Sequence, residues 1–216
     1  MPKVNEGYLK EKRNFILECT ENVLKEKPLY LITMRDIIKK AGFSQGVIYR
    51  YYSSLDDIYV DYVNKHTTND SLEEKIDIVL NSKLSEKKIL AECMRILGEY
   101  LEEVLQSMAG KTFFEFTVLY AYDFEKRNKL FSKLKLKQSI EYAQNTLMEY
   151  VMYHIEQGVF NPQIPVESII QFMSSFIDGL GQNVAIVNSP DSKQSLDVAE
   201  MFHILSDVLI GFLEEK

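Results

Sequence analysis

Three helix-start signals within residues 33–57 constrain the fold of this chain more than any other feature. Thr33 followed by Asp36 three positions later is a variant of the capping box. Gly42 can adopt the left-handed conformation that ends a helix, and Ser44 can cap the next helix only two residues further on. Ser54, followed by two aspartates in a first helical turn, starts a third helix. Short capped helices joined by a tight glycine turn predict a helix-turn-helix.

The rest of the chain also has a helical pattern. With 5 prolines and 9 glycines in 216 residues, it has few breakers, which favours helices over a turn-rich β-sandwich. Apolar stripes predict a helix over 166–187 and a last helix that starts near Asp191 or Ser192. Gly110 is expected to break one helix, and a long helix is expected over about 126–157. The predicted fold is all-α: a three-helix N-terminal head with the helix-turn-helix, then a helical bundle body of about six helices.

Composition limits the cellular context. No run of about 18 apolar residues exists, so no membrane span is expected. The polar N-terminus lacks the apolar region of a secretion signal, so the chain is predicted to be cytoplasmic. Cys19 and Cys93 are expected to be free thiols, and the histidines and cysteines lack zinc-ligand spacing. No metal and no cofactor is expected.

Charge is unevenly distributed along the chain. Residues 1–66 hold 11 Lys and Arg against 9 Asp and Glu, whereas residues 67–216 hold 14 against 23, within a net charge of −7. A mildly basic head on an acidic body can be oriented towards a polyanion. The excess is small, and charge alone favours ordinary variation over a nucleic-acid footprint.

Three segments resemble a known family: residues 33–37 (TMRDI), 41–52 (AGFSQGVIYRYY) and 56–59 (DDIY). They closely resemble the DNA-binding head of the TetR family of bacterial transcription regulators, and the detailed match covers residues 8–62. The resemblance implies a homodimer in which residues 1–63 form the DNA-binding domain. Residues 64–216 would then form the effector-binding and dimerisation domain. Leu55 departs from the family, which usually has a phosphate-contacting lysine there, and predicts weaker, less salt-sensitive DNA binding.

Residues 44–52 are expected to be the recognition helix in the major groove. Gln45 can pair bidentately with adenine, Val47 offers methyl groups to thymine, and Arg35 can reach guanine or a phosphate. One or two of the tyrosines are expected in the core, with Tyr49 or Tyr52 as the candidates. The predicted DNA-binding residues are Thr33, Arg35, Ser44, Gln45, Gly46, Val47, Tyr49, Arg50, Tyr51 and Tyr52.

Aromatic side chains in the body can line an effector pocket, although aromatics at helical spacing also form ordinary cores. The candidate effector residues are Phe113, Phe116, Tyr120, Asp123, Tyr150, His154 and Phe176. Methionines can add an adaptable wall or merely fill gaps: Met94, Met108, Met148, Met152 and Met173. The last two helices are the candidate homodimer interface, through Ile169, Met173, Phe176, Leu180, Phe202, Leu205 and Leu209.

The sequence therefore predicts a ligand-responsive, sequence-specific transcription regulator. We expect a repressor that binds double-stranded DNA with a palindromic operator and is released by a small apolar or aromatic effector. The effector would change the spacing of the two heads through residues 54–72. The alternative is a helical carrier or sensor of apolar small molecules that does not bind DNA. No nucleophile elbow or phosphate loop is present, so no enzymatic activity is expected.

Overall fold

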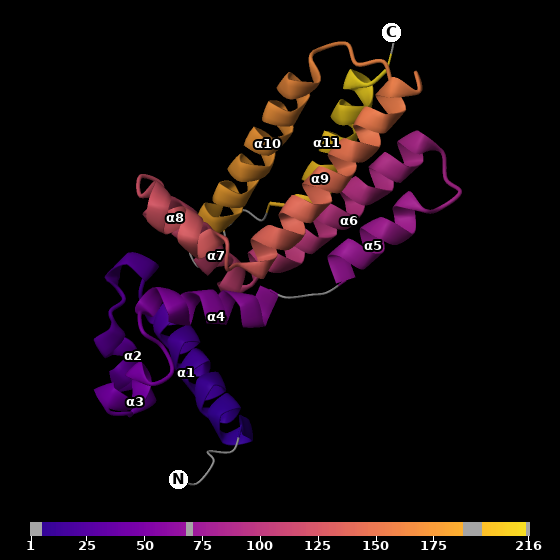
Figure 1. Cartoon of the computed structure of the whole chain (residues 1–216). Coiled ribbons are helices and arrows are strands. Elements are labelled where there is room, and N and C mark those ends of the chain that lie inside the picture. Colours follow the sequence, from indigo (N-terminus) through magenta and orange to yellow (C-terminus); the bar gives the residue numbers. More distant parts are fainter. Residues whose placement is uncertain (1–5, 68–70, 188–195, 215–216) are drawn as a thin grey trace. The chain divides into compact units, whose positions relative to one another are not determined.

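The computed structural model describes residues 6–67, 71–187 and 196–214. Within these ranges the chain forms eleven α-helices, one short 3-10 helix and no strand, which confirms the all-α fold class (Figure 1). The chain divides into two compact units, each of two segments. The first contains residues 1–68 and 108–135, and the second contains residues 69–107 and 136–216.

The first unit combines the N-terminal helices with a later helical pair. Helix α1 packs against α2 and α4, and α7 packs against α4, α1 and η1. Ile16, Ile37, Ile48 and Ile58 have no exposed surface and form the centre of this unit. Its elements are α1 (Glu6–Glu26), η1 (Leu29–Leu31), α2 (Met34–Ala41), α3 (Gln45–Tyr49), α4 (Leu55–Thr67), α7 (Met108–Leu119) and α8 (Phe124–Phe131).

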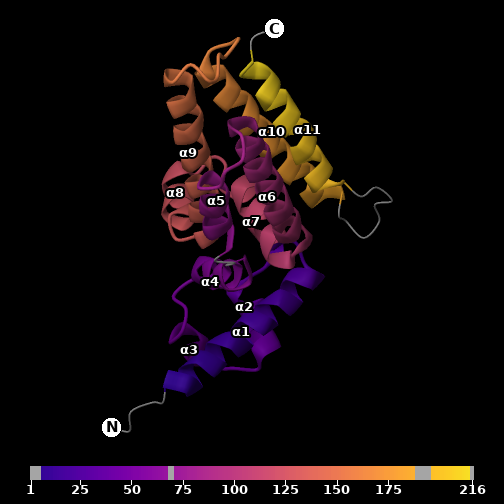
Figure 2. The ribbon, with the colours of Figure 1, turned by 90° about the vertical axis from the view of Figure 1, so that its right-hand side faces the viewer.

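The second unit is a bundle around α6. Helix α6 packs against α5, α10 and α11, and α10 lies beside α11 (Figure 2). The contact between α6 and α11 is close at Gly98, where a side chain would collide with Phe202. The elements are α5 (Ser71–Leu80), α6 (Glu86–Gln106), α9 (Lys135–Glu156), α10 (Val166–Val187) and α11 (Val198–Phe212). None of the described helices is both long and apolar enough to cross a membrane.

Several helix boundaries differ from the sequence prediction. Gly110 is buried inside α7, and the break comes earlier, at Ser107, whose backbone is extended. A helix interior tolerates glycine at a cost of about 1 kcal/mol when packing compensates. The expected helix over 126–157 is interrupted between α8 and α9.

Of the last two helices, α10 agrees with the sequence prediction and α11 differs from it. Helix α10 has the predicted bounds, Val166–Val187. Helix α11 begins at Val198, because the Asp197 carboxylate accepts a hydrogen bond from the amide of Glu200 at 2.8 Å and caps the helix there. The predicted cap at Asp191 or Ser192 lies outside the described residues.

Candidate DNA-binding surface and body cavity

The predicted caps position the helix-turn-helix. The Asp36 carboxylate accepts hydrogen bonds from the backbone amide of Thr33 at 2.9 Å and from its hydroxyl at 2.7 Å. Gly42 has φ +64°, the left-handed conformation, at the end of α2. Ser44 occupies the N-cap position of α3, but its side chain makes no capping hydrogen bond. The Ser54 hydroxyl accepts from the amide of Asp57 at 3.1 Å at the start of α4. The turn chemistry that the sequence predicts therefore fixes the local path of α2, α3 and α4.

Helix α3 has one buried face and one open face. Ile48 is fully buried, whereas Ser44, Gln45 and Gly46 are exposed. Most of the predicted DNA-binding residues lie on open surface. Exposed are Thr33, Arg35, Ser44, Gln45, Gly46, Tyr49 and Arg50, and half-buried are Val47 and Tyr51.

Tyr52 is the exception, and its predicted role in DNA contact is corrected. Only 3% of its surface is exposed, and its hydroxyl donates a 2.5 Å hydrogen bond to the Asp61 carboxylate on α4. Arg13 of α1 pairs with the same carboxylate at 3.2 Å and lies over the Tyr52 ring, 5.2 Å from its centre. Burial, followed by the Asp61 bond, raises the pKa of Tyr52 above its usual range. Tyr52 therefore anchors the end of the recognition segment to α4 and α1, as its four-residue spacing from buried Ile48 could have indicated.

The helix-turn-helix exposes two arginines, Arg35 on α2 and Arg50 at the end of α3. Neither Arg35 nor Arg50 forms an ion pair with another residue that the structure describes. Lys12 of α1 lies over the ring of Phe43, its ammonium 4.9 Å from the ring centre. Phe43 in turn contacts Phe15, with ring centres 5.5 Å apart, so the turn between α2 and α3 is fastened to α1. This aromatic contact was not predicted from the sequence.

The start of α4 carries no cation of its own. Leu55 is half-buried. The two acids that follow it are paired with residues 108–135, which contain α7 and α8 and are called the α7–α8 segment below. The Asp56 carboxylate accepts from the Tyr120 hydroxyl at 2.7 Å and pairs with the Lys126 ammonium at 2.9 Å. Lys133 pairs with Asp57 at 3.5 Å.

A further bond links α7 to the segment before α2. The Glu115 carboxylate accepts a hydrogen bond from the backbone amide of Leu29 at 2.9 Å. Together with the pairs at Asp56 and Asp57, this bond makes residues 108–135 part of the same compact unit as the N-terminal helices.

The second unit holds an apolar cavity of about 230 Å³ among α6, α9, α10 and α11. Its polar lining consists of Gln144, Asn145 and Ser174, and no described residue that lines it is charged. Of the five methionines that the sequence suggested, Met94, Met148 and Met173 line it. The full lining is Leu90, Met94, Leu97, Gln144, Asn145, Leu147, Met148, Val151, Val166, Ile169, Ile170, Met173, Ser174, Ile177 and Leu209.

None of the seven candidate effector residues lines this cavity. Phe113, Phe116, Tyr120 and Asp123 belong to the first unit, where Phe116 is fully buried against Tyr59. Asp123 caps α8 by accepting from the amide of Lys126 at 3.0 Å.

The other three lie in the second unit. The Tyr150 hydroxyl donates to the carbonyl of Glu86 at 3.3 Å, and His154 Nδ1 lies 2.8 Å from the carbonyl of Tyr150. Phe176 is half-buried on α10. Four of the seven residues thus belong to the first unit and three to the second, and an effector role for them stays a prediction.

Most of the predicted interface residues are used inside their own subunit. Buried within the second unit are Ile169, Leu180, Phe202, Leu205 and Leu209, and half-buried are Met173 and Phe176. A side chain buried in its own subunit has no surface left for a partner. Among the side chains of α10 and α11 that the structure describes, the large apolar ones that are exposed are Ile170, Phe172 and Ile204, at 37%, 43% and 45%.

Comparison with known proteins finds similar sequences. Residues 16–61 match the sequence model of a family described as "Bacterial regulatory proteins, tetR family". The chain is 28% identical over 185 residues to the uncharacterized HTH-type transcriptional regulator YfiR of Bacillus subtilis, covering 84% of each chain.

Solved structures share the whole fold at low sequence identity. A putative TetR-family transcriptional regulator from Syntrophomonas wolfei has a TM-score of 0.62 and 20% identity, over 95% of this chain and 97% of its own. The transcriptional regulator FadR from Bacillus subtilis, solved in complex with stearoyl-CoA, has a TM-score of 0.58 and 16% identity, over 93% and 98% of the two chains.

Proposed function

Because the chain belongs to the TetR family of bacterial regulatory proteins, with a DNA-binding N-terminal domain, we propose that it is a ligand-responsive, sequence-specific repressor of transcription. It acts in the cytoplasm as a homodimer on a palindromic operator, and a small apolar or aromatic effector releases it. The relatives are transcription regulators and not enzymes.

The open face of α3 is the observation that carries the DNA-binding part of the proposal. Gln45 and Gly46 are exposed at the start of a helix whose opposite face is held by buried Ile48 and Tyr52. An exposed glutamine amide can bond to N6 and N7 of adenine in the major groove. Arg35 and Arg50, which are unpaired among the described residues, supply phosphate contacts that set the register on the duplex.

In vitro selection from random duplexes, followed by fluorescence polarisation, tests this assignment. Gln45→Ala is expected to lose about 1–3 kcal/mol of discrimination at one base pair. Arg50→Ala is expected to weaken binding to all duplexes alike. It should also lower the slope of log affinity against log salt concentration by about one unit. Gln157→Ala, an exposed glutamine beyond α9, is the matched control. Selection that enriches no sequence would contradict the proposal and favour the carrier of apolar molecules.

A dimer follows from the small size of one DNA-binding head. A single module buries limited surface on DNA, so a second half-site about one helical turn or a multiple away raises affinity and specificity. We place the interface on the exposed apolar side chains of α10 and α11, including Phe172 and Ile204.

The chain connectivity supports a route from effector to DNA. Helices α6 and α9 both line the cavity, and they run directly into the two ends of the α7–α8 segment. Within the first unit, that segment is bonded to the N-terminal helices at Leu29, Asp56 and Asp57. An effector that binds the DNA-incompetent state better shifts the equilibrium, and a coupling of about 1–3 kcal/mol changes DNA affinity about 5- to 150-fold. FadR, which has the same fold, was solved with stearoyl-CoA, so a protein of this fold can hold an apolar chain.

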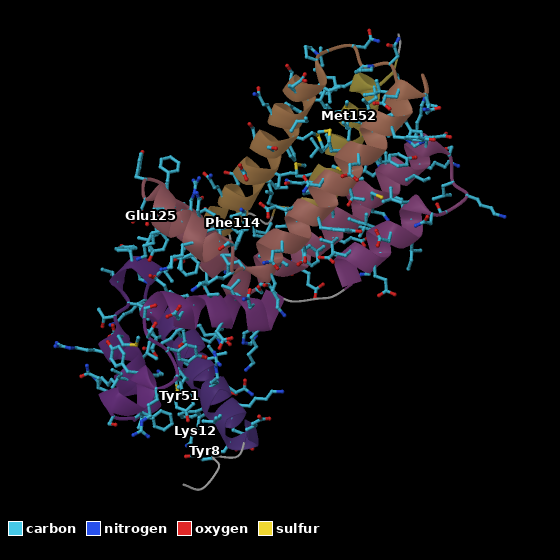
Figure 3. The ribbon with its side chains drawn as sticks, viewed as in Figure 1. Tyr8, Lys12, Tyr51, Phe114, Glu125 and Met152 are labelled. Atoms are coloured by element: carbon cyan, nitrogen blue, oxygen red, sulfur yellow. The ribbon has the colours of Figure 1, made fainter. Side chains whose placement is uncertain are left out.

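Removing one bond of this route tests it. The test uses 1-decanol, a neutral apolar molecule, as the effector. Glu115→Gln weakens the hydrogen-bond acceptor for the Leu29 amide. The variant is expected to bind 1-decanol as tightly as the wild type, but to lose less affinity for DNA when 1-decanol is bound. Glu125→Gln is the control, because Glu125 is exposed on α8 and makes no recorded bond with another described residue (Figure 3). If 1-decanol lowered the DNA affinity of both variants equally, the proposed route would be contradicted.

A further inference from the structure

We infer that the cavity among α6, α9, α10 and α11 selects an uncharged molecule with an apolar body and one hydrogen-bonding group at its end. The inference rests on the proposed function in one respect only: it takes this cavity to be the effector site. It goes beyond that function by naming the chemical class of ligand and by excluding anions.

The deep wall of the cavity is apolar. Leu90, Met94, Ile169 and Leu209 line it and are 0%, 2%, 4% and 6% exposed. The methionines add polarisable, flexible contacts that adapt to the shape of an aliphatic chain or a ring. A ligand that fills this end must therefore present hydrocarbon to it.

The polar part of the cavity lining comes from two helices, α9 and α10. Gln144 and Asn145 line it from α9 and are exposed, and Ser174 lines it from α10 and is half-buried. No other described residue engages these three side chains. Amides and a hydroxyl can both donate and accept hydrogen bonds, so they suit a hydroxyl, carbonyl or amide on the ligand.

The absence of a cation among the described lining residues decides the charge of the ligand. Moving a carboxylate from water into an apolar site without an opposite charge is strongly unfavourable. The same reasoning disfavours a sulfonate or a phosphate, so the site rejects anions that have the same apolar body as an accepted ligand.

The volume sets the size class. An engineered cavity of about 150 Å³ with an apolar lining holds one benzene ring. At about 230 Å³ this cavity is roughly one and a half times as large. It therefore fits a fused or paired ring system, or a chain of medium length.

A matched pair of fluorescent probes tests the charge selectivity on the full-length protein. N-phenyl-1-naphthylamine is neutral, and 8-anilinonaphthalene-1-sulfonate has the same aromatic framework with an added sulfonate. The neutral probe is expected to bind at least about tenfold more tightly. Competition by 1-decanol against decanoate at neutral pH should give the same order. Equal or tighter binding of the anions would overturn the inference.

Two variants assign the binding to this cavity. Met148→Phe narrows the cavity and is expected to weaken the binding of the neutral probe at least about tenfold, or ~1.4 kcal/mol. Met152→Phe, one turn away on α9 and outside the cavity, is the control (Figure 3). Asn145→Arg adds a cation at an exposed position and should narrow the difference between neutral and anionic probes, without a risk to folding. If neither Met148→Phe nor Asn145→Arg changes binding, the assignment of the probe to this cavity is wrong.

Measurements of DNA binding distinguish a failure of the inferred charge selectivity from a failure of the proposed effector role. If 1-decanol binds as expected but leaves the affinity for the selected operator unchanged, the inferred selectivity stands and the effector role fails. If decanoate releases the operator and 1-decanol does not, the selectivity fails and the effector role stands.

Discussion

At the scale of single residues, a buried tyrosine and a carboxylate hold the DNA-binding segment in place. Tyr52 is buried, and its hydroxyl is bonded to Asp61, which also pairs with Arg13. The three groups join α1, the end of the recognition segment and α4. Base contacts depend on such supporting side chains, because a recognition helix that tilts by a small angle loses its hydrogen bonds.

Tyr52→Phe should lower the free energy of unfolding by about 1–2 kcal/mol, because the half-buried Asp61 loses a donor. DNA affinity should fall as well, although the Tyr52 side chain is buried. Urea unfolding and polarisation measure the two effects. Tyr49→Phe is the control for stability, since the Tyr49 side chain is 46% exposed. An equal loss of stability in both variants would show that the Asp61 bond is unimportant.

Asp36 should make stability depend on pH in the acid range. The hydrogen bond from Lys27, at 2.5 Å, and those from Thr33 lower the pKa of Asp36 from 3.8 to about 2. Since the folded-state pKa lies below the unfolded one, the contribution is fully present above pH 3.8 and is lost as the pH falls towards about 2. Between these limits, the urea midpoint of Asp36→Asn should vary less with pH than that of the wild type. If the urea midpoints of the variant and the wild type changed equally with pH, Asp36 would not be the source of this pH dependence.

At the scale of elements, close contact between α6 and α11 depends on one glycine. A Cβ atom at Gly98 would lie 2.6 Å from Cβ of Phe202 and 2.9 Å from its Cγ. Both atoms are near the backbone, so the ring cannot move away without shifting α11. The two helices could not pack at this distance with any larger residue at position 98.

Gly98→Ala should therefore destabilise the protein by about 1–3 kcal/mol through overpacking. In an open helix position the same change stabilises by about 0.5–1 kcal/mol. Gly211→Ala provides this comparison, because nothing lies within 4 Å of an added Cβ there. Thermal unfolding of both variants measures the difference, and a stabilised Gly98→Ala would contradict the close packing.

At the scale of the whole molecule, the proposed dimer depends on apolar surface that the subunit leaves exposed. Ile204 on α11 and Phe172 on α10 are each more than two-fifths exposed. Single exposed apolar residues are normal in monomeric proteins, whereas large contiguous apolar patches mark interaction sites. The proposed interface requires these side chains of α10 and α11 to be covered together by a second subunit.

Ile204→Glu is expected to dissociate the dimer and to weaken operator binding, because a charge would be buried at the interface. Sedimentation velocity measures the assembly, and polarisation measures the DNA affinity. Ile78→Glu is the control, since Ile78 is 63% exposed on α5, away from the proposed interface. A dimer that survives Ile204→Glu would place the interface elsewhere.

The sequence by itself determined the local structure of the DNA-binding segment. The cap at Thr33, the left-handed turn at Gly42 and the cap at Ser54 each depend on atoms within about four residues, so the pattern contains them completely. Only the tertiary structure decided that Tyr52, and not Tyr49, is the buried one of the two candidate tyrosines. It also decided that α7 and α8 pack with the N-terminal helices, and that the cavity takes its lining from four separate helices. An apolar stripe shows which face of a helix is buried but not which element covers it, and several helices of this chain have equally apolar faces.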